Sequence, residues 1–149
     1  MKLYKLYIYF WFTALTVLII GLFYYNLEET IVINIYDTYF IIPSFHLTIF
    51  ITFLLAFIGL IYFLHSKFEI PLFKFLSRIH TLVSISCIFL FYLSSFLKFK
   101  KKNDFPLFNQ DNYLNHFIVS ILITFICIQL IFIFNSLFSI ILYYTKKNK

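Results

Sequence analysis

Long apolar runs dominate the pattern of hydrophobic and polar positions along this chain of 149 residues. Four runs are long enough for a helix that crosses the hydrocarbon core of a bilayer, which needs roughly 20 residues. None of them contains a charged side chain or an internal proline. The pattern therefore predicts four transmembrane helices, at about residues 6–25, 45–64, 79–97 and 113–144.

The composition indicates the same class of protein. The chain is 62% hydrophobic and only 12% charged, whereas a soluble domain is about a quarter charged. A small globule in water cannot cover its surface with so few polar groups. Glycine and proline are scarce, so we expect a single domain over residues 1–149 without a flexible linker. The predicted fold is all-α, with four transmembrane helices in an antiparallel bundle.

The basic residues lie outside the apolar runs and bear on orientation more than on nucleic-acid binding. If the N-terminus is cytoplasmic, eight lysines and arginines fall on that side and four on the other. An excess of Lys and Arg is typical of cytoplasmic loops. We therefore expect a multi-pass protein of the plasma or inner membrane, with both termini in the cytoplasm, the lipid bilayer as its surroundings and no nucleic-acid partner. The four exceptions are Lys98, Lys100, Lys101 and Lys102.

Small and polar residues recur at helical spacing in three of the runs. Such stripes let membrane helices approach closely and form hydrogen bonds with one another. We expect the three stripes to meet in the centre of the bundle, with Phe and Ile turned towards lipid. They are Thr48, Thr52, Ala56 and Gly59 in the second run; Ser77, His80, Thr81, Ser84, Cys87 and Ser94 in the third; and His116, Ser120, Thr124, Cys127 and Asn135 in the fourth.

Signatures of catalysis and transport are missing from the sequence. It contains no phosphate-binding glycine loop, no GxSxG and no HExxH. Acidic and basic side chains within a span, which mark many transport pathways, are also lacking. We expect a protein that is not an enzyme. For His65 and His80, at the ends of runs, we expect imidazoles whose polar tips reach water.

One segment departs from the apolar pattern, "INIYDTYFIIPSFH" at residues 33–46. It resembles the stretch of the haem–copper oxidase large subunit (cytochrome c oxidase subunit I) that commonly reads HDTYFVVAHFH. The shared core is Asp37 to Phe40, followed by Phe45 and His46, and the resemblance extends over about residues 31–65. In that family the stretch forms an outer loop and the start of a transmembrane helix.

The resemblance bears on haem binding. In the family the first histidine of HFH ligates the oxygen-reducing haem, and Ser44 stands in its place here, so the resemblance implies no oxygen reduction by this chain. The second ligates the low-spin haem, and His46 occupies that position. Such a haem takes two axial imidazoles, and His116 would supply the other at the same depth, although "NYLNHFIVS" does not match the family's motif. We expect no cofactor, with haem held by His46 and His116 as the alternative.

The outer loop, residues 27–44, alternates apolar and polar positions, which predicts a short β-hairpin on the membrane surface. We expect Asp37, Thr38, Tyr39 and Pro43 to hold this loop, with Asp37 accepting hydrogen bonds within it and Pro43 preceding the second helix.

Three functions remain open on the sequence. The first is an accessory or assembly protein related to the respiratory-oxidase large subunit. The second is a low-spin haem protein that transfers electrons, and the third is a structural or lesion-forming membrane protein. The corresponding partners are a respiratory membrane complex or a second copy of the chain.

Overall fold

The computed structural model describes residues 5–24, 30–35, 38–99 and 112–147. Within this part of the chain, four helices are long and apolar enough to cross a membrane. Two strands lie between the first and second helices. The elements in chain order are α1 (Leu6–Tyr24), β1 (Thr30–Ile35), β2 (Thr38–Pro43), α2 (Ser44–Lys67), α3 (Lys74–Phe99) and α4 (Asn112–Lys147).

Three of the helices are longer than the apolar runs that predicted them. α3 begins at Lys74, before the predicted start at residue 79, and α2 and α4 both continue to a lysine. The apolar runs mark only the part of each helix whose side chains suit the hydrocarbon core of a bilayer. Helical hydrogen bonding continues past it, because long basic side chains reach water while their stems stay on apolar surface.

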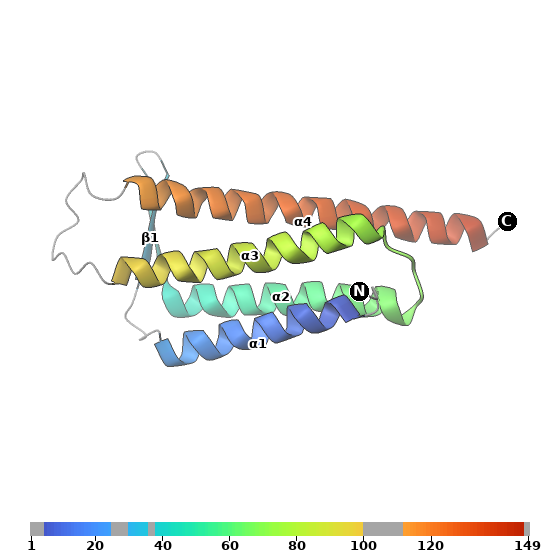
Figure 1. Ribbon diagram of the computed structural model, residues 1–149, viewed down its shortest axis with the longest axis horizontal. Helices are drawn as coiled ribbons and strands as arrows, with labels where there is room; N and C mark the ends of the chain where they lie inside the picture. The colour runs from blue at the N-terminus through green and yellow to red at the C-terminus, as the bar shows by residue number, and fades with distance from the viewer. Residues whose placement is uncertain (1–4, 25–29, 36–37, 100–111, 148–149) are drawn as a thin grey trace.

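The four helices lie side by side along the long axis of the molecule (Figure 1). α1 and α3 begin at the end where α4 finishes, and α2 and α4 begin at the opposite end, next to the strands. The outward side chains are largely apolar. Phe53, Phe89 and Phe134, for example, are each about two thirds exposed or more. Lipid is the surrounding in which such a surface is stable.

α1 and α2 approach each other closely at two glycines. A Cβ atom at Gly21 would collide with the side chain of Thr48, and one at Gly59 would lie 2.5 Å from Cδ1 of Trp11. The indole Nε1 of Trp11 also donates to the carbonyl oxygen of Ala56, at 3.3 Å. Small residues of the second helix do mediate close packing, but Ala56 and Gly59 face α1, so the expectation that they meet the stripes of the third and fourth helices is wrong.

The stripe predicted on the third helix is confirmed, because its members are buried in the bundle. The side chains of Ser77 and Ser84 are fully enclosed, and His80 is 1% exposed. The other buried members of this stripe are Thr81, Cys87 and Ser94.

The stripe predicted on the fourth helix is wrong for most of its length. His116, Ser120, Thr124 and Cys127 are exposed. Thr124 donates its hydroxyl proton to the carbonyl oxygen of Ser120 in the same helix, at 2.8 Å, so it needs no partner helix. The buried face of α4 carries Ile118, Ile121, Ile128, Phe132, Asn135, Ser136 and Ser139 instead.

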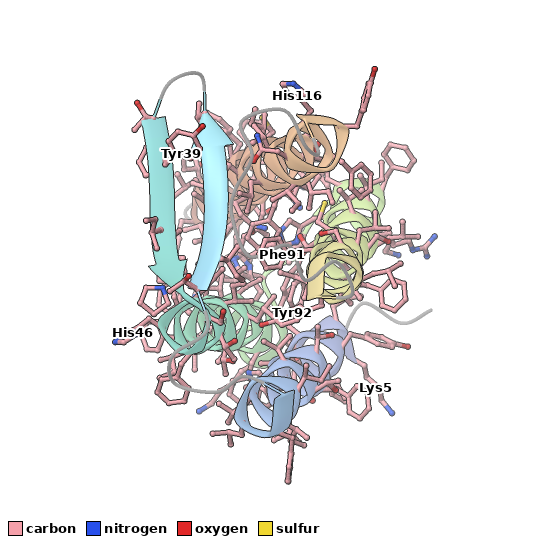
Figure 2. All side chains as sticks on the ribbon, turned by 90° about the vertical axis from the view of Figure 1, so that its left-hand side faces the viewer. Lys5, Tyr39, His46, Phe91, Tyr92 and His116 are labelled. Carbon is pink, nitrogen blue, oxygen red and sulfur yellow. The ribbon has the colours of Figure 1, made fainter. Side chains whose placement is uncertain are left out.

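The strands form a two-stranded antiparallel sheet at one end of the bundle. Thr30 pairs with Pro43, and Ile35 pairs with Thr38. β1 contacts α4 and β2 contacts α2, so the sheet spans the gap between these helices (Figure 2). Ile31 and Ile33, two residues apart and therefore on one face, are buried against the bundle. α2 starts directly after Pro43, as predicted.

Candidate functional site

A set of buried and half-buried polar side chains lies towards the end of the bundle where α3 begins. They come from three helices, α2, α3 and α4, and form a cluster of interhelical hydrogen bonds. We call this set the buried polar cluster. Its members are Tyr62, His65, Ser77, His80, Ser84, Gln129, Asn135 and Ser136.

The imidazole of His80 is the centre of the cluster, and both of its nitrogens are hydrogen-bonded. Nε2 lies 2.9 Å from Oε1 of Gln129, and Nδ1 lies 2.9 Å from the hydroxyl of Tyr62. An amide oxygen can only accept, so Nε2 carries the proton and donates to Gln129. In the neutral ring Nδ1 is then an acceptor, and Tyr62 donates to it. Gln129 in turn donates from Nε2 to Oγ of Ser84, at 3.3 Å.

Aromatic rings enclose the same imidazole. Phe132 of α4 stacks on it with ring centroids 4.5 Å apart and planes at 16°. Phe10 of α1 is also stacked, at 5.4 Å. Phe132 stacks on Tyr62 as well, at 4.8 Å. His80 of α3 therefore contacts the three other helices, through hydrogen bonds along the edge of its ring and ring contacts on its faces.

Asn135 of α4 supports the start of α3. Its Oδ1 accepts from the backbone N–H of Phe73, at 3.2 Å, and its Nδ2 donates to Oγ of Ser77, at 3.1 Å. The first N–H groups of a helix have no acceptor within the helix. Phe73, just before α3, has no side-chain oxygen to cap this end. Asn135 supplies a cap from a different helix.

His65 lies next to this contact and is 4% exposed. Its Nε2 lies 2.7 Å from the hydroxyl oxygen of Ser136 on α4. Its Nδ1 is buried and has no hydrogen-bond partner among the described residues. The backbone carbonyl oxygen of His65 accepts a hydrogen bond from the N–H of Ile70, at 3.0 Å, which holds the turn that follows α2. His65 thus attaches the end of α2 to α4.

The expectation that His65 and His80 reach water is wrong, because both are buried. The reason is the extension of the helices. α2 continues to Lys67 and α3 starts at Lys74, so His80 lies inside its helix, and His65, in the last turn of α2, is covered by α4 through its contact with Ser136. The stripe on the third helix did indicate a buried position for His80. No sequence signal singled out Tyr62 or Ser136 as partners.

The proposed haem ligands lie at the other end of the bundle, near the sheet. His46 is on α2 and His116 on α4, and both are exposed. Figure 2 shows them on different sides of the molecule, with side chains that point outwards and not towards each other. The structure therefore does not bring the two imidazoles together within one chain. Haem ligation by them stays a prediction.

The residues expected to hold the outer loop are only partly within the described chain. Thr38, Tyr39 and Pro43 belong to β2 and are exposed. Asp37, and with it the expected hydrogen bonds to its carboxylate, lies outside the described residues.

The chemistry open to the buried polar cluster is hydrogen bonding between neutral groups. Its members include no carboxylate or ammonium group, and both nitrogens of His80 are hydrogen-bonded, whereas Nδ1 of His65 has no hydrogen-bond partner among the described residues. Across the described part of the chain, no three His, Cys, Asp or Glu side chains are grouped so as to hold a metal ion. The arrangement is suited to joining helices.

Comparison with known proteins gives no relative from which to assign this site. No protein-family model, curated protein or solved structure matches the chain. Its function is therefore inferred from its own residues.

Proposed function

We propose that this chain is a small non-catalytic membrane protein that serves as an accessory or assembly subunit of a respiratory-oxidase complex. The non-catalytic part of this proposal rests on His80, because both of its ring nitrogens form hydrogen bonds, one with Tyr62 and one with Gln129. A histidine that acts as a base or a ligand needs a nitrogen directed at its substrate or metal. In this chain both nitrogens of the His80 imidazole form hydrogen bonds with neighbouring helices.

The choice of partner rests on the oxidase-like segment. The segment shares Asp37 to Phe40, Phe45 and His46 with the stretch HDTYFVVAHFH of the oxidase large subunit, with Ser44 in place of a histidine, and α2 begins at Ser44. Around the bundle, the exposed apolar faces of α3 and α4 offer surface to lipid and to helices of a partner. Such contacts in lipid depend on close packing, because apolar side chains gain little by leaving one apolar surrounding for another.

Purification of the tagged chain from its own membrane in a mild detergent tests this proposal. We expect it to migrate on native gels with an oxidase large subunit, and we expect the chain separated from that complex to lack a haem spectrum. Recovery only as a free chain or as an oligomer of itself would contradict the accessory role. Sharp low-spin haem bands on reduction, lost in both His46→Ala and His116→Ala, would establish the haem alternative instead.

We further propose an antiparallel bundle in the plasma or inner membrane, with the sheet on the outer surface and both termini in the cytoplasm. α1 begins and α4 ends at one end of the molecule (Figure 1). Six of the seven lysines and arginines in the described part of the chain lie there, all except Lys98 of α3, which favours the cytoplasmic side. They are Lys5, Lys67, Lys74, Arg78, Lys146 and Lys147.

Labelling of single cysteines tests the orientation. After Cys87 and Cys127 are replaced, a cysteine is introduced at Lys147 or at Glu28, which precedes β1. A maleimide that cannot cross the membrane should label Glu28→Cys in intact cells, and Lys147→Cys only after the membrane is opened. Labelling of Lys147→Cys in intact cells would place the C-terminus outside.

A further inference from the structure

A cavity of about 690 Å³ lies between the segment that joins α2 to α3 and the last turns of α4. We call it the basic groove. This volume is in the range of pockets that hold small organic ligands. The residues that matter for its chemistry are Pro71, Phe73, Lys74, Tyr143, Lys146 and Lys147.

The charge of the basic groove is uniformly positive. Lys74 enters from α3, and Lys146 and Lys147 enter from the last turn of α4. No acidic residue lines it among those that the structure describes. Glu69 is the only acidic residue in the described part of the chain, and it is not part of the lining. Three ammonium groups without a carboxylate among them attract an anion.

The backbone at the groove adds to this preference. α3 starts at Lys74, and the N–H groups in the first turn of a helix favour a negatively charged group. The N–H of Phe73 is already bound by Asn135, which fixes the start of the helix against α4. The phenyl ring of Phe73 stacks on that of Phe138 of α4, with ring centroids 5.9 Å apart, and this contact also holds the start of α3 against α4.

The rest of the lining is apolar, and the groove lies where two candidate membrane spans end. The span of α3 begins at Lys74, and the span of α4 ends at Lys147. Pro71, Leu72 and Leu142 supply apolar lining. Tyr143 is of the type enriched at membrane interfaces. A ligand that fits this setting carries a negative charge at headgroup level and apolar chains next to it.

We propose that the basic groove binds the headgroup of an anionic phospholipid. Its phosphate lies among Lys74, Lys146 and Lys147, and its acyl chains run along the exposed apolar surface of α3 and α4. Basic pockets between membrane helices are a recurrent setting for anionic lipids. This site is independent of the proposed oxidase partner, because it depends only on the end of the bundle that bears the groove.

Quenching by brominated lipids tests the proposal in vesicles of phosphatidylcholine that contain the full chain. Tyr143→Trp places a reporter in the groove, and the signal from Trp11, the only native tryptophan, is subtracted with the unsubstituted protein. Brominated phosphatidylglycerol should quench the reporter at a mole fraction roughly a hundredfold lower than brominated phosphatidylcholine, if the three groove lysines contribute about equally. We expect about a fivefold loss of this preference for each groove lysine replaced by glutamine, since a lysine near the surface contributes roughly 1 kcal/mol.

Matched lysines outside the groove provide the control. Lys146→Gln with Lys147→Gln should remove most of the preference, and Lys74→Gln should weaken it from another helix. Lys5→Gln with Lys67→Gln removes the same charge from exposed positions that do not line the groove, and should leave the preference unchanged. Equal quenching by the two lipids, or an equal loss in the control pair, would overturn the proposal. Equal quenching by the two lipids, together with a change in reporter emission on addition of inorganic phosphate at an ionic strength matched with chloride, would show that the groove binds free phosphate and not lipid.

Discussion

Replacement of His80 by alanine should destabilise the folded protein by about 3 kcal/mol, the largest effect we expect in the bundle. The substitution removes a ring that stacks on Phe132 and Phe10. It also removes the partner of the Gln129 amide oxygen and the closer partner of the Tyr62 hydroxyl, which keeps only the carbonyl oxygen of Ser77 at 3.5 Å. Hydrogen bonds between membrane helices contribute on average only about 0.6 kcal/mol each. The lost packing should therefore account for most of the effect.

Unfolding of the purified protein in mixed micelles with increasing SDS, followed by circular dichroism, measures this change. Tyr62→Phe separates the two contributions, because it keeps the ring and removes one hydrogen bond; we expect a cost of about 0.6 kcal/mol. His116→Ala is the matched control on an exposed histidine, and it should change stability by less than about 0.5 kcal/mol. If His80→Ala is no more destabilising than His116→Ala, the buried polar cluster does not hold the helices together.

Gly59→Leu should destabilise the contact between α1 and α2 by about 1–3 kcal/mol, the usual range for overpacking of a well-packed site. Even a Cβ atom at this position lies 2.5 Å from Cδ1 of Trp11 and 3.3 Å from Cβ of Phe10. An indole ring cannot yield as the end of a flexible chain does, so the helices must separate. The hydrogen bond from Trp11 to the carbonyl of Ala56 should weaken at the same time.

The same SDS titration measures the effect, with Phe57→Leu as the control. Phe57 lies two residues away on α2 and is 49% exposed, so its replacement should have little effect. A double-mutant cycle with Trp11→Ala tests the cause, because loss of the indole should relieve part of the strain from Leu at position 59. Equal costs for Gly59→Leu and Phe57→Leu, or strict additivity with Trp11→Ala, would show that the helix contact lies elsewhere.

The candidate site was only partly readable from the sequence. The stripe that holds Ser77, His80 and Ser84 on the third helix was visible, because polar residues are rare enough there for their spacing to stand out. On α4 the same kind of spacing was misleading for all but Asn135. This helix is apolar on nearly every side, so its exposed hydroxyls resembled a packing face although Thr124 bonds within its own helix. Asn135 was on that predicted stripe and is buried, but its role at the start of α3 was not predicted.

The four membrane helices were determined by the sequence alone, since hydrocarbon requires each spanning segment to satisfy its own backbone hydrogen bonds and to be apolar along its length. Both properties are local to a segment. The close approach at Gly59 was also indicated locally, because a stripe of small residues on one helix permits it with any neighbour. Only the tertiary structure decided that this neighbour is α1, that His80 meets Tyr62 and Gln129, and that three lysines from two helices border one groove. These pairings depend on how each helix is rotated and shifted relative to the others. When a helix is apolar on nearly all sides, lipid does not favour one rotation over another. A few contacts between side chains then determine the arrangement.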